Sequence, residues 1–308
     1  MYYNYDLIVV KPRANKKKII IIVLIALTVI ALSIYGGIQF AKYINDRNIA
    51  IAEENKRQEQ IRLEQEKIEE QKRIEEEKRL EEAKRLKNAQ ALTEEQMQAI
   101  ENIYSSEEKR VFLTFDDGPT SQVTPLILDL LKQENIKATF FVLGNRAKAN
   151  PDLIKREFDE GHYIANHGYT HKYSQIYSKP QNVLDEYNYT DSCIQEALGN
   201  ADYHSRVFRF PGGSVGGYYN SIKKEAKKLL RQNNIVSLDW NALSKDADGA
   251  HTKESIMENV RATVGEKNSV IILMHDASDK ILTYETLPDV IQFFRENGYT
   301  FKTIYDIL

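Results

Sequence analysis

Apolar and polar positions change their pattern along the chain, and these changes divide it into segments of different character. Residues 19–40 form an uncharged apolar run, which follows a basic head within residues 1–18. Residues 41–106 are dominated by charged and amide side chains and contain no glycine or proline. In residues 107–308, short apolar runs alternate with stretches of helical periodicity. The pattern predicts a tail, an apolar helix, a charged spacer and one folded domain.

The apolar run is long enough to cross a bilayer, which takes about 20 residues, whereas a secretory signal core has about 7–15. Lys16, Lys17 and Lys18 precede the run directly, and basic residues tend to stay in the cytoplasm. We therefore expect a single-pass membrane helix with a cytoplasmic N-terminus and with the folded domain outside the cell. A cleaved signal peptide is the alternative.

The charged spacer contains the related segments IEEQKR, IEEEKR and LEEAKR, with apolar residues six positions apart. A six-residue step turns a helix by about 600°, so no continuous apolar seam forms and a long coiled coil is disfavoured. Glu69 and Arg73 stand four residues apart, as do Glu75 and Arg79, a spacing that supports an isolated helix. The spacing predicts a solvated helix, with a disordered linker as the alternative.

Alternating strands and helices in the folded domain predict an α/β fold with a parallel sheet or barrel. The expected strands are 111–115, 138–142, 163–165, 207–210, 235–238, 270–274 and 301–304, and the expected helices are 124–133, 182–198, 221–232 and 254–264. In such folds the chemistry lies at the carboxyl ends of the strands.

Charge and cysteine content exclude several function classes. The net charge of −3 does not favour a nucleic-acid partner. A single cysteine, Cys193, excludes an internal disulfide framework and a thiolate metal cluster. It leaves an extracellular location open, because a domain with a large core needs no disulfides.

Polar clusters follow the predicted strands one after another. They are the Asp116–Asp117 pair in TFDDGP, His167 and His171 in NHGYTH, Arg209 in RFPGG, the segment DWNALSKDAD, and His275 in LMHD. A parallel sheet or barrel would bring all of them to one edge. The sequence therefore predicts one composite site built from several strand ends.

His167 and His171 are the best candidates for metal ligands, because a four-residue spacing can place both imidazoles on one side of a helical turn. With Asp117 they would form a two-histidine, one-carboxylate set of the kind that catalytic zinc sites use. Two surface histidines are the alternative. Zn²⁺ suits these ligands best, and Co²⁺, Ni²⁺ or Mn²⁺ remain open.

Asp116 and Asp117 end the first predicted strand, where neighbouring side chains point to opposite sides. We therefore expect different tasks for the two, one as a metal ligand and the other as a general base toward water. The alternative is that Asp116 and Asp117 only begin a turn through Gly118 and Pro119, but this does not explain why the turn ends an apolar strand.

The order of these motifs resembles that of the polysaccharide deacetylases, the NodB-homology carbohydrate esterases, over residues 110–308. The resemblance rests on TFDDG, HGYTH, RFPGG and LMH in the family's order. It implies a distorted (β/α)7 barrel that hydrolyses the acetamide of an N-acetylated sugar. It also implies Asp116 as the base, and Asp117, His167 and His171 as the metal ligands.

The remaining roles follow from the same resemblance. His275 would protonate the departing amine, and the backbone N–H of Gly212 would stabilise the oxyanion, with Leu273 also at the substrate. Arg209 is expected to pair with Asp116 and to lower the pKa of that carboxyl. We expect Asp246, in preference to Asp239, to orient His275.

The sequence departs from the usual family pattern at three positions, Gly168, Gly212 and Ala247. Gly168 replaces a hydroxyl residue that would steady the loop between the histidines. Gly212 and Ala247 replace larger side chains, so an aromatic wall of the groove is expected to be lost. Tyr169, Tyr173 and Tyr177 are expected to pack in the core, and stacking on sugar rings is the alternative for them. These changes affect substrate fit more than the reaction.

A membrane anchor, a spacer and an outward-facing deacetylase domain together point to peptidoglycan. We therefore expect a peptidoglycan N-acetylglucosamine deacetylase. Alternative substrates are poly-N-acetylglucosamine, chitin-like oligomers and acetylated xylan, and a catalytically silent wall-binding module is the alternative of another class.

Overall fold

The computed structural model describes residues 16–308, with side chains described except at residues 16, 77 and 80–88. The chain divides into two compact units, Met1–Glu76 and Glu77–Leu308. Lys11 and Arg13 of the predicted basic head lie outside the described residues.

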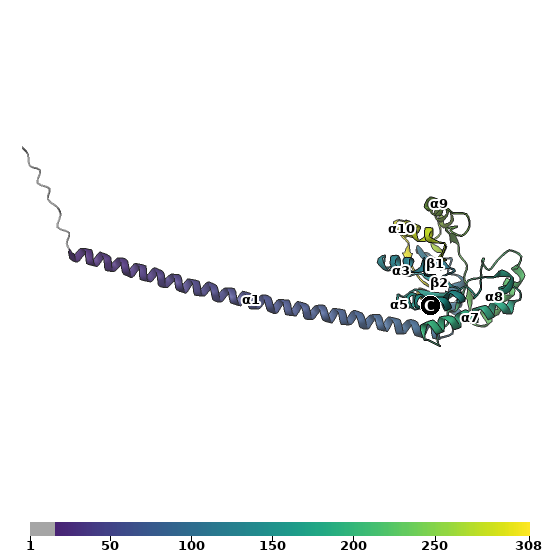
Figure 1. The fold of residues 1–308 in the computed structure, drawn as a ribbon, viewed down its shortest axis with the longest axis horizontal. Helices are drawn as coiled ribbons and strands as arrows, with labels where there is room; N and C mark the ends of the chain where they lie inside the picture. Colours follow the sequence, from purple (N-terminus) through teal and green to yellow (C-terminus); the bar gives the residue numbers. More distant parts are fainter. Residues whose placement is uncertain (1–15) are drawn as a thin grey trace, which may run out of the picture. The chain divides into compact units, whose positions relative to one another are not determined.

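Helix α1 extends without interruption over Lys16–Ala89 (Figure 1). Within Lys17–Glu76 an 18-residue window reaches a mean hydropathy of 2.9 with none of it buried, so the helix is long and apolar enough to cross a membrane. A signal sequence near the N-terminus would meet the same criterion. Farther along, Arg73 forms its ion pair with Glu70, at 2.8 Å, three residues away on the helix.

The second unit is built on a sheet in which every strand pairing is parallel. Its strands are β1 (Arg110–Asp116), β2 (Thr139–Val142), β3 (Tyr163–Asn166), β4 (Val207–Phe208), β5 (Val236–Ser237), β6 (Ala242–Leu243), β7 (Ser269–His275) and β8 (Thr300–Phe301). The order is β5-β4-β3-β2-β1-β7-β6, and β8 pairs with β1. The sheet curls into a half-barrel, which confirms the predicted distorted barrel.

Helices cover the sheet between successive strands, as a βαβ chain requires. They are α2 (Glu94–Glu101), α3 (Thr124–Gln133), α4 (Gly144–Ala149), α5 (Pro151–Asp159), α6 (Tyr173–Ile176), α7 (Pro180–Leu198), α8 (Asn220–Gln232), α9 (Lys253–Val264) and α10 (Ile281–Glu296). The four predicted helices are confirmed as α3, α7, α8 and α9. The short helices α4, α5 and α6, the longer helix α10, which carries Pro288 in its interior, and the two-residue strand β6 were not predicted.

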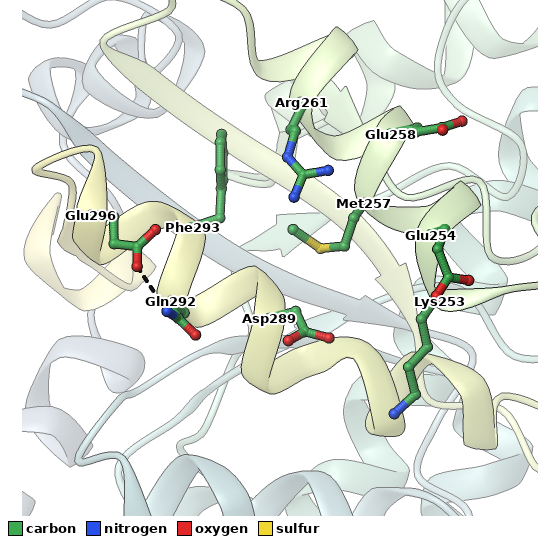
Figure 2. A pocket seen from close by; sticks show the side chains of 9 residues that line it. All are labelled: Lys253, Glu254, Met257, Glu258, Arg261, Asp289, Gln292, Phe293 and Glu296. Carbon is green, nitrogen blue, oxygen red and sulfur yellow. Dashed lines mark hydrogen bonds between the residues drawn. The ribbon is translucent and has the colours of Figure 1, made fainter.

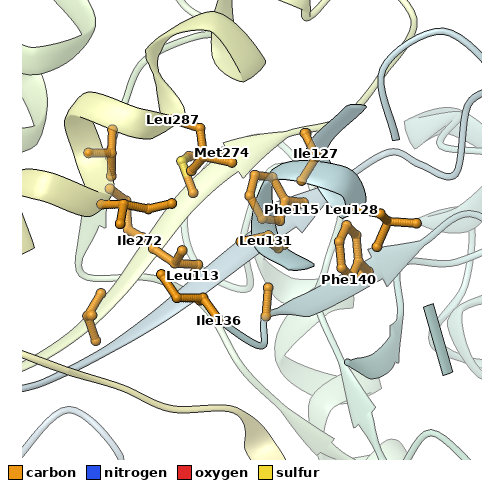
Figure 3. Packing of buried hydrophobic residues seen from close by; sticks show 14 of the residues in the cluster. Leu113, Phe115, Ile127, Leu128, Leu131, Ile136, Phe140, Ile272, Met274 and Leu287 are labelled. Carbon is orange, nitrogen blue, oxygen red and sulfur yellow. The ribbon is translucent and has the colours of Figure 1, made fainter. Parts of the chain in front are cut away.

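Strand β1 explains how the fold points one carboxylate toward the site. Its residues alternate between the two faces of the sheet. Leu113 and Phe115 pack with Ile127 and Leu128 of α3 in the main core (Figure 3). Phe112, which points the other way, belongs to a second cluster inside the curl. Asp116 stands four residues after Phe112 and therefore faces the inside of the curled sheet.

Helix α2 closes the second cluster. A capping box at Thr93 and Gln96 begins the helix, and Ile100 and Ile103 are completely buried. Their cluster also includes Phe112 of β1. The packed unit therefore takes in residues before position 107, where the sequence analysis placed the start of the folded domain.

Candidate active site

A pocket of about 500 Å³ lies at the carboxyl ends of β1, β3 and β7, where the parallel sheet was expected to gather its polar residues. Among the residues that line it are Asp116, Asp117, His167, His171, Gly212, Asp246, Leu273 and His275. Arg209 is the one predicted site residue behind the lining, and it is fully buried.

Arg209 holds Asp116 from inside the curled sheet. Its Nη1 lies 2.7 Å from Asp116 Oδ1 and 2.8 Å from Thr114 Oγ1. Its Nε donates to the carbonyl of Leu238 at 3.1 Å, and the guanidinium lies 3.8 Å from the ring centroid of Phe141. The expected pairing of Arg209 with Asp116 is therefore present in the structure.

The pKa of Asp116 is set by two opposing effects. Burial raises the pKa of this carboxyl, and the nearby charge of Arg209 lowers it, as expected. The effect of burial is the larger, so the pKa lies above its usual value. Oδ2 faces His167 Nε2 at 3.7 Å. A buried carboxylate of raised pKa with one oxygen toward a pocket is a suitable proton acceptor.

Asp117, His167 and His171 form a cluster that could hold a metal ion. Asp117 Oδ1 lies 3.6 Å from His167 Nε2 and 3.4 Å from His171 Nε2. Atoms bound to one tetrahedral zinc ion at about 2.0–2.2 Å lie about 3.3–3.6 Å apart, so these separations fit such an ion.

Two further features support this fit. Asp117 Oδ1 is buried without a hydrogen-bond partner among the described residues, which is costly unless another ligand satisfies it. His167 Nδ1 lies 2.7 Å from the carbonyl oxygen of Arg209. A proton on Nδ1 leaves the lone pair of Nε2 directed at the cluster.

The backbone around the cluster differs from what was expected. Asp117 has φ 75°, so the chain leaves the strand there, and Asp116 and Asp117 both reach the imidazole of His167 rather than opposite sides. Residues 167–171 form a loop rather than a helical turn, and His171 has φ 57°. Left-handed backbone at non-glycine residues is costly and is typical of functional sites.

Glu186 of α7 steadies this loop in place of the missing hydroxyl at Gly168. Its carboxylate accepts hydrogen bonds from the backbone N–H groups of Tyr169 and Thr170, at 2.8 and 2.9 Å. It also accepts one from the hydroxyl of Thr170, at 2.7 Å. Glu186 could not be predicted from the sequence, because no local pattern links a helix residue to a loop sixteen positions earlier.

His275 is oriented by Asp246, the residue that was expected in this position. The imidazole Nδ1 lies 2.8 Å from Asp246 Oδ1. Although burial disfavours the charged imidazole, the hydrogen bond and charge of Asp246 raise the pKa of His275 to about 9. Asp239, the rival candidate, instead accepts hydrogen bonds from the backbone N–H and hydroxyl of Ser214.

The pocket keeps aromatic walls, contrary to expectation. Ala247 lies in the lining without an aromatic ring, but Trp240 and Tyr173 also line the pocket. Tyr173 is 42% exposed and is therefore not a core residue, whereas Tyr177 is buried as expected. Leu273 of β7 adds an apolar surface.

A second groove, about 550 Å³ in volume, lies between α9 and α10 (Figure 2). It is lined by charges of both signs, including Arg261, Glu258 and Asp289, and a hydrogen bond joins Gln292 to Glu296. None of the predicted site residues lines this groove, so we assign the chemistry to the smaller pocket at the strand ends.

Comparison with known proteins identifies the family that the chain resembles. The sequence model described as polysaccharide deacetylase matches residues 104–232. A peptidoglycan-N-acetylglucosamine deacetylase of Bacillus cereus is 33% identical over 205 residues, covering 65% of this chain and 89% of that protein. One of Listeria monocytogenes is 32% identical over 199 residues, covering 65% of this chain and 39% of that protein.

A solved structure gives the same result for the fold. The structure of a Streptococcus mutans CE4 esterase matches with a TM-score of 0.60 and 31% sequence identity. The match covers 69% of this chain and 91% of that chain.

The curled parallel sheet carries a carboxylate, an oriented imidazole and a cluster that could hold a metal ion at its carboxyl edge, an arrangement typical of hydrolases built on parallel barrels. The similarities in sequence and structure make the assignment specific. The chain belongs to the polysaccharide deacetylase family, as the sequence motifs indicated, and is a hydrolase of the carbohydrate esterase type.

Proposed function

We propose that this protein removes the N-acetyl group from N-acetylglucosamine residues of peptidoglycan and releases acetate. The names of the Bacillus cereus and Listeria monocytogenes relatives support this substrate. The observation that carries the proposal is the pairing of Asp116 with His275 across neighbouring strands, next to the Asp117, His167 and His171 cluster. A base and an acid thereby stand side by side in one pocket.

In the proposed reaction Asp116 accepts a proton from the attacking water through the oxygen that Arg209 leaves free. The water oxygen bonds to the acetyl carbon, and the N–H of Gly212 stabilises the negative charge that develops on the acetyl oxygen. His275 then donates a proton to the nitrogen as the C–N bond breaks. The products are acetate and a free amine.

Arg209 and Asp246 position the base and the acid of the proposed reaction. Arg209 fixes the Asp116 carboxylate, and Asp246 fixes the ring of His275 with Nδ1 engaged. Leu273 offers an apolar wall suited to the acetyl methyl group.

We propose that Asp117, His167 and His171 hold Zn²⁺, although Co²⁺, Ni²⁺ or Mn²⁺ would also be accepted by these ligands. When bound, the ion would act as a Lewis acid and lower the pKa of water in the pocket. The buried, unpartnered oxygen of Asp117 supports its role as a ligand.

We further propose that residues 19–40 anchor the protein in the membrane, with residues 1–18 in the cytoplasm and the catalytic domain facing the wall. The exposed apolar stretch of α1 and the basic residues before it support this topology. Residues 41–89, at about 1.5 Å per helical residue, would form a spacer of about 70 Å.

Acetate release tests the proposed function. The full chain in detergent is incubated with N-acetylated peptidoglycan, with and without added zinc, beside Asp116→Asn. Zinc-dependent acetate that disappears in the variant is the expected result. If acetate is released from poly-N-acetylglucosamine, chitin-like oligomers or acetylated xylan but not from peptidoglycan, that other polymer is the substrate. If the protein binds zinc but releases no acetate from any of these polymers, the proposal fails and the alternative of a catalytically silent wall-binding module is favoured.

A further inference from the structure

The phenol of Tyr173 stands where a side chain on residue 212 would otherwise lie. Its hydroxyl is 2.5 Å from the position that a Cβ atom would take on Gly212. Gly212 also has φ 73°, a conformation that favours glycine. A glycine at 212 and a tyrosine at 173 are therefore compatible, whereas any larger residue at 212 would displace the phenol.

Helix α6 fixes the position of this phenol relative to the site. The ring centroid of Tyr173 lies 5.6 Å from that of His171 and 5.8 Å from that of Tyr177. The hydroxyl of Tyr177 donates to the carbonyl oxygen of Pro211 at 2.7 Å. Helix α6 and Tyr177, the residue directly after it, therefore support both the Tyr173 ring and the backbone that leads into Gly212.

The hydroxyl of Tyr173 is available to a ligand. Tyr173 lines the active-site pocket, and in the described part of the chain its hydroxyl forms no hydrogen bond. The backbone N–H of Gly212 likewise has no acceptor among the described residues. A neutral phenol can both donate and accept at neutral pH. Two polar groups without protein partners thus lie next to each other at the pocket.

We propose that Tyr173 is a substrate-binding residue whose hydroxyl donates a hydrogen bond to an oxygen of the N-acetylated sugar, beside the N–H of Gly212. The inference rests on the proposed function and adds a residue that recognises the substrate. Tyr173 also supplies, from a different segment of the chain, aromatic surface that the glycine at position 212 cannot provide. The protein would thus recognise its sugar through helix α6, which follows the second histidine.

Binding is measured on full-length Asp116→Asn protein in detergent, with the N-acetylglucosamine tetramer as the probe in a calorimetric titration. Tyr173→Phe removes only the hydroxyl, and Tyr189→Phe makes the same change at an exposed tyrosine outside the pocket. We expect Tyr173→Phe to weaken tetramer binding about three- to tenfold, the size of one neutral hydrogen bond, and Tyr189→Phe to leave it unchanged. Equal affinities in all three proteins, or no tetramer binding to any, would overturn the inference.

Kinetics separate substrate recognition from a structural effect. With Asp116 intact, Tyr173→Phe should lower kcat/KM on the tetramer by a similar factor and leave the hydrolysis of 4-nitrophenyl acetate, which has no sugar, unchanged. An equal loss on both substrates, or a weaker zinc affinity, would assign Tyr173 to the support of His171 and overturn the inference. A Tyr173-dependent binding difference without any acetate release would support the inference and contradict the proposed function.

Discussion

Asp246 holds His275 at two points. Its Oδ1 lies 2.8 Å from the imidazole Nδ1, and its Oδ2 accepts the backbone N–H of His275 at 2.8 Å. The hydroxyl of Thr283 donates to the same Oδ2 at 2.7 Å. The carboxylate therefore fixes the ring, keeps Nδ1 protonated and leaves Nε2 available to the substrate.

We predict that Asp246→Asn lowers the upper pH limit of activity. Burial alone would lower the pKa of His275, and Asp246 is the main reason that this pKa is about 9. An acid must be protonated to act, so the alkaline limb of kcat/KM should fall near pH 9 in the wild type. In the variant it should move toward the ordinary histidine value of about 6.5, with a loss of up to about 30-fold at pH 8.

Asp248→Asn is the matched control, because Asp248 lines the same pocket but is exposed. Its pH profile, measured by acetate release from N-acetylglucosamine oligomers, should match that of the wild type. An unchanged alkaline limb in Asp246→Asn would show that Asp246 does not set the pKa of His275.

Arg209→Met should impair both folding and catalysis. Arg209 is fully buried, and its removal leaves Asp116 as a buried carboxylate without a counter-ion. Breaking such a pair typically costs about 3–5 kcal/mol. The pKa of Asp116 should rise further, so that at neutral pH the base is protonated and activity falls by about 100-fold or more.

Arg231→Met is the control for Arg209→Met, because it removes a more exposed arginine that pairs with Glu94. Exposed pairs contribute about 0–1 kcal/mol, so this variant should unfold in denaturant near the wild-type midpoint and keep its activity. Similar free energies of unfolding for the two variants would contradict the importance of the buried pair.

His171→Ala should abolish tight zinc binding. It removes one of three atoms that converge on the cluster, and even supporting residues around metal ligands change affinity about 10–100-fold. Zinc content after dialysis and a calorimetric titration measure the effect. His251→Ala changes an exposed histidine outside the cluster and should bind zinc normally. Equal zinc affinity in both variants would remove His171 from the ligand set.

The strand ends, and with them the polar residues that gather in one pocket, could be predicted from the sequence because they depend on local patterns. An apolar run that ends in two aspartates is a short-range signal, and β1 places Asp116 accordingly. Helix α3 was predicted with its exact bounds, since its apolar spacing is regular. The contact with His275 that was expected of Asp246 in preference to Asp239 is present in the structure.

The features that the sequence did not predict depend on contacts between distant segments. Glu186 steadies the histidine loop from α7, and Tyr173 approaches Gly212 across 39 positions. The side chain of Asp117 reaches His167 because its backbone leaves the extended conformation, which strand alternation cannot foresee. Such contacts are decided by tertiary packing, not by local spacing.

The position of α2 leads to a last prediction about where the folded domain begins. Ile100 is completely buried in a cluster with Phe112 and Ile271, so Ile100→Ala should lower the free energy of unfolding by about 2–5 kcal/mol. Ile68→Ala, at a side chain that is 45% exposed on α1, should cost far less because no cavity forms. Denaturant unfolding followed by near-ultraviolet circular dichroism reports the difference. Equal unfolding midpoints would mean that α2 is dispensable and that the domain starts near residue 107. A large difference would make the segment from Leu92 onward part of the catalytic domain, because the same helix closes the inside of the curled sheet on which Asp116 stands.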